Sequence, residues 1–295
     1  MTEERVGRND VLLVIVASLA FATSGPLGKI ATSIPAVTVA AVRTGLAALA
    51  VGLLAPRALV TSLRALSNRH RVAVVLAGGL LAAHFVLFLG GLGATSLPAA
   101  VALVSLEPLA VVVAAFLAFG LRPTRLEIVG IVLATAGALV VASGAGAGEH
   151  RLAGDLMVLG AVVLYGIYVA AARGLRDAMP ALPYAAVVYA SSTVLLLPLS
   201  LAVGLQATPT PPTTGAFLSV LGLALIPTLV GHSLVQSAAR HAPPALVALV
   251  SPGETVGSLA IGAIAMGALP SPREGAGAAL VLLGATIAVL SRRPR

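Results

Sequence analysis

The sequence predicts an all-α integral membrane protein with ten transmembrane helices, built as two inverted five-helix repeats. Three observations carry this prediction. The chain of 295 residues is 59% hydrophobic and only 9% charged, whereas a soluble domain carries about 25% charged residues. Its apolar runs are long enough to cross a bilayer, and acidic and histidine positions recur in its two halves. Lipid must therefore be the solvent for most of the chain.

A helix needs about 20 mostly apolar residues to cross the hydrocarbon. The apolar runs are continuous and rich in alanine and leucine, without the alternation of an outer-membrane barrel. The N-terminal segment lacks a small-residue cleavage site, so we expect the first span to stay in place. A Gly-rich break after the fifth span divides repeats of residues 1–146 and 147–295. The ten expected spans are 11–30, 36–55, 72–93, 98–120, 126–143, 155–173, 183–204, 215–237, 244–267 and 274–291.

The basic residues predict that both termini lie in the cytoplasm. Lysine and arginine collect in cytoplasmic loops. With the N-terminus inside, only Lys29, Arg151 and Arg273 fall outside, and Arg43 falls within a span. The remaining fourteen fall inside: Arg5, Arg8, Arg57, Arg64, Arg69, Arg71, Arg122, Arg125, Arg173, Arg176, Arg240, Arg292, Arg293 and Arg295. The net charge of +8 therefore reports topology in a cell membrane and predicts no nucleic-acid partner.

The two halves resemble each other position by position. Asp10 opens the first span and Asp155 the sixth, which is 145 positions later (10 to 155). Five spans per half is an odd number, so the second copy must enter the membrane in the opposite orientation. Inverted repeats of this kind are found in many secondary transporters, whose binding sites lie near the midplane between the repeats.

Two histidines and two glutamates inside the expected spans are the main candidates for a functional site. His84 and His232 stand 148 positions apart, and Glu107 and Glu254 stand 147 apart (84 to 232, 107 to 254). A charged carboxylate within a span costs about 2.5–3.5 kcal/mol on insertion scales. The glutamates are therefore expected to bind protons or a substrate ammonium, the alternative being a protonated structural hydrogen bond. The histidines either relay protons or serve as neutral structural hydrogen-bonding groups.

Arg43 and two tyrosines complete the candidate set. Arg43 lies deep in its span, where it would pair with a glutamate, bind a substrate carboxylate or extend its side chain toward the interface. Tyr165 and Tyr168 share one helix face and could offer hydroxyls to a ligand. No metal site is predicted, because neither His84 nor His232 has a second ligand at i+3 or i+4 and the chain has no cysteine. No cofactor is predicted either.

The sequence resembles the EamA family of the drug/metabolite transporter superfamily over nearly its whole length. The resemblance lies in two aspartate-led first helices, NDVLLVIVASLAFATSGPLGKI and GDLMVLGAVVLYGIYVAAARGL, and in two closing helices, RLEIVGIVLATAGALVVA and PREGAGAALVLLGATIAVL. Arg43, Glu107-Pro108, Gly231-His232-Ser233 and Glu254 match further family positions, whereas Thr23-Ser24-Gly25 replaces a Trp-Gly pair of many members. The resemblance implies an exporter of small metabolites, often amino acids, with a central cavity between the halves.

The sequence analysis therefore predicts a secondary transporter that exports small metabolites such as amino acids by alternating access, coupled to protons. Its expected partners are a small-molecule substrate, membrane lipids and protons. A drug or lipid exporter, or an importer, is the alternative within transporters. An intramembrane enzyme is the alternative from another class, but no Gly-x-Ser-Gly, His-Glu-x-x-His or phosphate-binding motif appears. A non-transporting scaffold or sensor is disfavoured by the short loops.

Overall fold

The computed structural model describes residues 8–95, 97–143, 152–206, 212–266 and 272–290, and within them the chain is helical with no strand. The expected division between residues 146 and 147 lies outside the described residues. So do five of the basic residues used to predict topology, Arg5, Arg151, Arg292, Arg293 and Arg295. The helical class predicted from composition is confirmed.

The helices follow one another with short connections. In the first half they are α1 (Arg8–Phe21), α2 (Ser24–Ile30), the 3₁₀ turn η1 (Ala31–Ser33), α3 (Ala36–Leu54), α4 (Pro56–Ala65), α5 (Asn68–Ala94), α6 (Leu97–Val104), α7 (Glu107–Phe119) and α8 (Arg125–Ser143). In the second half they are α9 (Leu152–Gly174), α10 (Ala181–Gln206), α11 (Thr214–Leu223), the π-helical segment η2 (Ala224–His232), α12 (Ser233–His241), α13 (Pro244–Ala248), α14 (Val250–Met266) and α15 (Pro272–Leu290).

Seven helical segments of the described chain are long and apolar enough to cross a membrane. They coincide with seven of the expected spans and run over Arg8–Ser33, Ala36–Leu54, Asn68–Ala94, Leu152–Gly174, Ala181–Gly204, Thr214–His241 and Pro244–Ala265. The other three expected spans, 98–120, 126–143 and 274–291, coincide with the α6–α7 pair, α8 and α15. These fall outside that set, so the count of ten stays a prediction.

Local sequence signals fix several helix ends. Ser67 caps the start of α5 by accepting a hydrogen bond from His70 N, and Thr213 caps α11 by accepting one from Ala216 N. Such caps satisfy backbone donors that have no partner within the helix. Gly120 ends α7 with a positive φ of 65°, a conformation that other residues adopt only under strain.

Two prolines break the helices that carry the candidate glutamates. Proline has no N–H to donate to the carbonyl four residues earlier. Pro108 therefore leaves Val104 without that partner, and Val104 is the last residue of α6. Pro252 does the same to Ala248, the last residue of α13. The expected fourth span is consequently two short helices, with Glu107 at the first position of α7.

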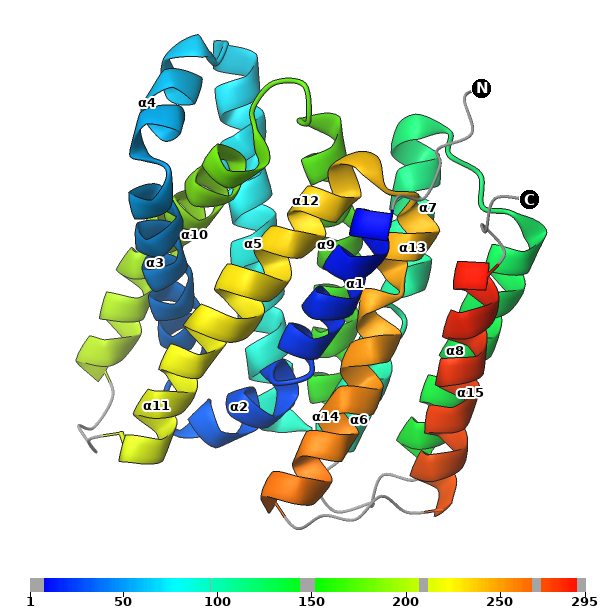
Figure 1. Cartoon of the computed structure of the whole chain (residues 1–295). Helices are drawn as coiled ribbons and strands as arrows, with labels where there is room; N and C mark the ends of the chain where they lie inside the picture. Colours follow the sequence, from blue (N-terminus) through cyan, green and yellow to red (C-terminus); the bar gives the residue numbers. More distant parts are fainter. Residues whose placement is uncertain (1–7, 96, 144–151, 207–211, 267–271, 291–295) are drawn as a thin grey trace.

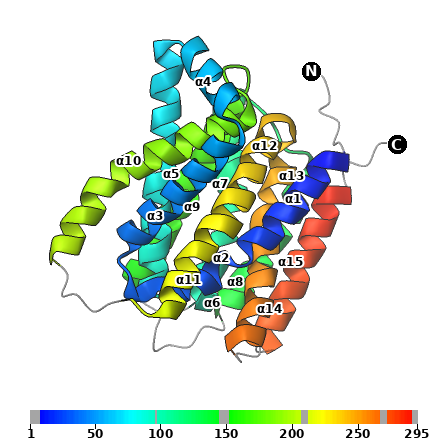
Figure 2. The same ribbon diagram turned by 60° about the vertical axis from the view of Figure 1, so that its left-hand side comes forward.

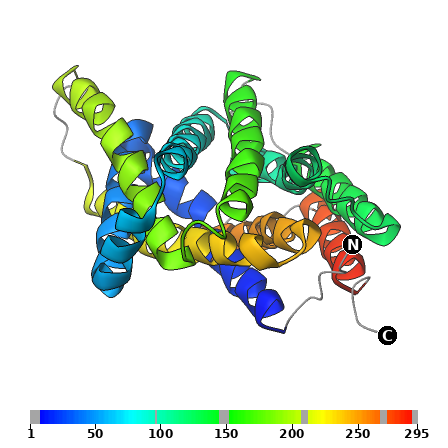
Figure 3. The same ribbon diagram turned by 90° about the horizontal axis from the view of Figure 1, so that it is seen from above.

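Equivalent helices of the two halves pack against each other (Figure 1). α8 lies beside α15 at one side of the molecule, and α3 packs on α10 at the other, as the view from above also shows (Figure 3). Between them α5 packs on α9, and α1 contacts η2, α12 and α14. The C-terminal end of α10 projects to the left edge of the molecule in Figure 2.

The contact between α8 and α15 is close and antiparallel. A Cβ atom added at Gly137 would lie 2.7 Å from Val281 N, and one added at Gly284 would lie 2.5 Å from Ala134 N. The later residue of each helix thus faces the earlier residue of the other, as antiparallel packing requires. Small residues let the two backbones approach this closely. The register follows the repeat. Val281 is the position equivalent to Ala134, and Gly284 is the position equivalent to Gly137, each 147 residues later (134 to 281, 137 to 284). The two contacts are therefore counterparts of each other.

The outer surface of the bundle is apolar. Leu53 is 79% exposed and Ile264 is 87% exposed, and most other exposed large side chains of the spans are leucine, isoleucine or valine. Contiguous apolar surface of this extent would be unstable in water and is suited to lipid. Several buried polar side chains lie inside the bundle instead, among them His84, Glu107, His232 and Glu254.

Candidate transport site

Both candidate glutamates face one small cavity between the repeats. Glu107 comes from the break before α7, and Glu254 from the first turns of α14. The Ser251 hydroxyl donates a hydrogen bond to Glu107 Oε2. Within the described chain the Glu254 carboxyl has no such donor. The two acids are therefore placed alike but held differently, which the repeat pattern alone did not predict.

The two histidines line the same cavity. The His84 ring on α5 meets the His232 ring at the end of η2, with 6.0 Å between ring centroids. His84 Nδ1 lies 2.9 Å from Ala161 O and must carry the hydrogen, because a carbonyl only accepts. His232 Nδ1 is buried without a partner among the described residues. His84 is thus tied to α9, whereas His232 keeps a free hydrogen-bonding atom.

Aromatic side chains complete the cavity wall. The chain has only ten phenylalanines and tyrosines in all, and four of them, Phe21, Phe85, Phe88 and Tyr165, line this cavity. Its volume is about 20 Å³, enough for about one water molecule. A substrate of amino-acid size does not fit in this volume, so its binding requires the helices to move apart.

The two candidate tyrosines have different surroundings. Tyr165 lines the cavity, and its buried hydroxyl has no partner among the described residues. Tyr168 lies one turn further along α9, where it accepts a hydrogen bond from Gln236 Nε2, and its ring centroid is 5.9 Å from that of His232. Tyr168 is not part of the cavity wall.

Arg43 lies behind the cavity wall. Its guanidinium carbon is 3.9 Å from the centroid of the Phe85 ring, and its Nε donates to Thr228 Oγ1 over 2.7 Å. The side chain is fully buried, so it does not extend to the membrane interface. No ion pair with either glutamate occurs within 4.0 Å in the described chain. Five of the seven predicted residues thus share one cavity, with Arg43 and Tyr168 directly outside it.

Several polar residues of this region were missed from the sequence. Ser251, Thr228 and Gln236 are short or neutral side chains without an equivalent in the other repeat. The one signal for Ser251 was its position one helical turn before Glu254. Tyr189 also belongs to this region, where its hydroxyl bonds Thr228 O at 3.0 Å and Ser233 Oγ at 2.9 Å.

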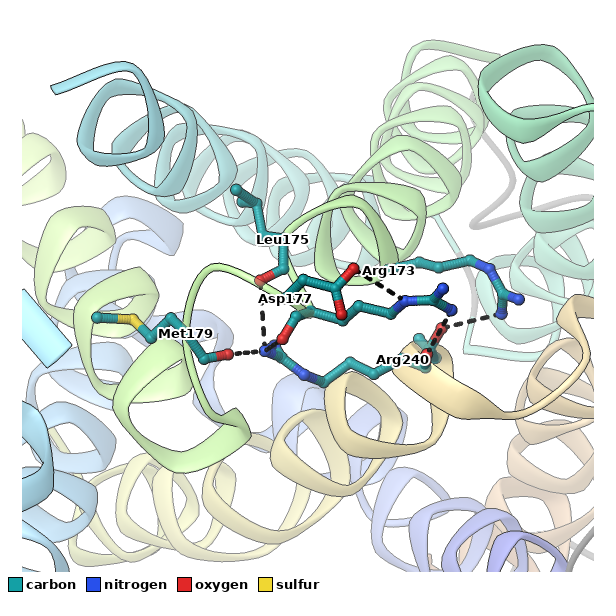
Figure 4. A network of polar contacts seen from close by, with 7 residues as sticks. Arg173, Leu175, Asp177, Met179 and Arg240 are labelled. Atoms are coloured by element: carbon teal, nitrogen blue, oxygen red, sulfur yellow. Dashed lines mark hydrogen bonds and ion pairs between the residues drawn. The ribbon is translucent and has the colours of Figure 1, made fainter. Parts of the chain in front are cut away.

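Two buried arginines hydrogen-bond the α9–α10 connection and the end of α12, and Figure 4 shows them from close by. Arg240 Nη2 donates to the carbonyls of Leu175, Arg176 and Met179 in the α9–α10 connection. Arg173 Nη1 donates to Ala242 O at 2.9 Å and Ala239 O at 3.4 Å, at the end of α12. Cations at a helix C-terminus satisfy its last carbonyls and favour its dipole. Arg173 and Arg240 with these carbonyls form the upper latch.

An equivalent contact closes the lower end. Lys29 Nζ lies 2.9 Å from Thr95 O and 3.4 Å from Leu92 O, at the end of α5. These acceptors are 147 positions before those of Arg173 (92 to 239, 95 to 242). Lys29 with these carbonyls forms the lower latch. Beside it, an apolar cavity of about 210 Å³ lies between α2, η1, α3 and α5.

The chain matches the model of the EamA-like transporter family twice, over residues 9–143 and 152–290. It therefore belongs to the EamA-like transporter family, and the expected family is confirmed. A multi-span membrane transporter of small molecules is the class of protein that this membership and the helical fold define.

A solved structure has the same fold. That structure, named only "Crystal structure of protein", superposes with a TM-score of 0.77 over 97% of this chain and 99% of its own, at 22% sequence identity. At that identity the likeness concerns the fold. No curated protein matches the sequence.

Proposed function

We propose that this transporter exports small metabolites such as amino acids by alternating access, in exchange for protons. The observation that carries the proposal is the pair of carboxyls, one from each repeat, that face one closed cavity from the breaks of two discontinuous helices. Discontinuous helices that meet at the interface of two repeats form the substrate and ion sites of many secondary transporters.

The proposed topology is ten spans in two inverted repeats, residues 1–146 and 147–295, with both termini in the cytoplasm. Its support is the antiparallel pairing of equivalent helices, α8 with α15 and α3 with α10, where Thr44 Oγ1 lies 2.9 Å from Thr193 Oγ1 and Ser200 Oγ lies 2.9 Å from Thr38 Oγ1. Two equivalent helices can be antiparallel only if one repeat is turned over relative to the other.

Proton coupling is supported by the apolar surroundings of the acids. A charged carboxylate in a closed apolar cavity is costly, and a protonated one is not. Opening the cavity to water on either side removes that cost. Glu107 and Glu254 can therefore hold a proton while the cavity is closed and exchange it when the cavity opens, with His232 as a neighbouring acceptor.

The test is transport in proteoliposomes by the purified protein, with a panel of amino acids and organic cations. An imposed pH gradient is expected to drive uptake or release of a panel member. Glu254→Gln is expected to lower this flux at least about 100-fold and Glu107→Gln at least tenfold, since each removes one exchangeable proton of the site. Asp177→Asn, whose side chain is 92% exposed at the molecular surface, is the matched control.

If transport persists without dependence on the pH gradient or on either glutamate, proton coupling is wrong and the protein is a facilitator. If flux collapses equally in Asp177→Asn, the loss reflects charge or folding in general and not the cavity.

An exporter of cationic drugs is the second candidate. The specific observation in its favour is the set of four aromatic rings around the two carboxyls, because aromatic faces attract ammonium groups. Transport of organic cations in preference to amino acids from the same panel would select this candidate.

A further inference from the structure

Arg43 is a buried cation whose charge is incompletely satisfied. Its side chain has no exposed surface, and only Nε has a hydrogen-bond acceptor. Nη1 and Nη2 are buried without partners among the described residues. These two atoms carry four of the five donors of a guanidinium. A buried charge without an ion-pair partner is costly, and a ligand carboxylate at these two atoms would supply that partner.

The guanidinium is held in one orientation by its neighbours. Thr228 Oγ1 donates its own hydrogen to Leu223 O at 2.7 Å and is therefore free to accept from Arg43 Nε. Thr228 lies in the π-helical segment η2, and the Tyr189 hydroxyl donates a hydrogen bond to the Thr228 carbonyl. Departures to π-helix are frequent at functional sites. With Nε fixed in this way, the Nη1 and Nη2 edge stays available.

Phe85 separates this edge from the cavity of the glutamates. One face of its ring lies over the guanidinium, and the same side chain lines the cavity, where its centroid is 4.9 Å from that of His232. Arg43 is near enough to Glu254, His84 and His232 to interact with them electrostatically. A rotation of the Phe85 side chain would therefore join the guanidinium to the cavity.

We propose that Nη1 and Nη2 of Arg43 form an anion subsite that binds the carboxylate of the transported molecule, and that Phe85 covers it in the closed conformation. A guanidinium binds a carboxylate through two parallel hydrogen bonds, a geometry that lysine does not offer. Together with a glutamate for the ammonium group, this subsite selects a zwitterion over a simple amine. The inference rests on the proposed function and names its substrate class.

The experiment compares acids with their decarboxylated amines: leucine with isoamylamine, and phenylalanine with phenethylamine. Equilibrium binding to the purified protein is measured by thermal stabilisation in detergent, alongside flux in proteoliposomes. The wild-type protein is expected to bind each acid at least tenfold more tightly than its amine. Arg43→Gln is expected to lower acid binding more than tenfold and amine binding less than about twofold. Arg43→Lys should recover only part of the preference.

One further variant and one further measurement separate binding from folding. Thr228→Val removes the acceptor of Nε and keeps the side-chain shape, so acid binding should weaken about three- to tenfold while amine binding holds. Ligand-free Arg43→Gln is expected to unfold at the same or a higher temperature than wild type, because a binding residue held without compensation costs stability. A structural arginine would lower that temperature.

Absence of an acid preference in the wild type, or an equal loss of acid and amine binding in Arg43→Gln, overturns the subsite. These outcomes differ from failure of the proposed function. An acid preference that depends on Arg43 but no flux driven by a pH gradient contradicts proton-coupled export and leaves the subsite standing. Gradient-driven flux, together with an acid preference that Arg43→Gln leaves unchanged, supports proton-coupled export and contradicts the subsite.

Discussion

Gly284→Leu is expected to destabilise the protein by about 3 kcal/mol or more, at the upper end of overpacking effects. A side chain at this position would overlap Gly130 O and press on Ala134 N of α8. Because these atoms belong to backbone, neither can move aside without separating the two helices. We expect the folded yield in mild detergent to fall at least tenfold, with a lower unfolding temperature in the fraction that folds.

Gly275→Leu is the matched control in the same helix, since nothing lies within 4 Å of a Cβ atom added there. Leucine has a higher helix propensity than glycine by roughly 0.5–1 kcal/mol, so this variant should be neutral or slightly more stable. Equal unfolding temperatures for the two variants would contradict the close α8–α15 contact.

Arg240→Ala is expected to lower the free energy of unfolding by about 3 kcal/mol. Each hydrogen bond from a charged donor contributes roughly 1.5–3 kcal/mol, and its loss leaves buried carbonyls without a donor. Arg240 is 2% exposed, donates to three carbonyls of the α9–α10 connection and lies over Tyr184, 5.2 Å from the ring centroid. Thermal unfolding of the purified variant measures the effect.

Arg176→Ala is the control for the upper latch. Its side chain is 41% exposed and makes one 3.4 Å hydrogen bond to Arg240 O, so the change should stay within about 1 kcal/mol.

A second measurement uses the absence of native cysteine. Ser24→Cys places a single thiol in the cavity wall. Its labelling by an impermeant reagent from the upper end should quicken in Arg240→Ala, and an unchanged rate would deny the latch a role in closure.

The fold was largely predictable because long, continuous apolar segments in a sequence predict membrane helices. Seven expected spans are matched closely, and Pro108 and Pro252 stand at the breaks of two helices. What the sequence did not indicate is that these breaks create two half-helices. A proline predicts a missing hydrogen bond, whereas the neighbouring packing decides whether the helix bends or ends.

The candidate site was predictable where the sequence places a polar group in an apolar span, because such a placement is energetically costly. Glu107, Glu254 and His232 are polar groups in apolar spans, and the repeat pattern indicated that they belong together. Ser251 and Thr228 carry no such cost, because hydroxyls satisfy themselves within a helix by bonding to backbone carbonyls. Their roles depend on which helix faces which, and that follows only from the three-dimensional packing.

The two latches are built from different cations, and on the proposed topology the upper latch lies on the cytoplasmic side. The lower latch uses one lysine and lies beside an apolar cavity, whereas the upper latch uses two buried arginines. Under the proposed export, the closing free energy that the upper latch contributes lowers the fraction of molecules that stand open toward the cytoplasm. The apparent dissociation constant for cargo on that side is the intrinsic constant divided by the fraction of molecules that stand open. Every 1.4 kcal/mol of such closing free energy would then raise the cytoplasmic concentration needed for half-maximal export tenfold.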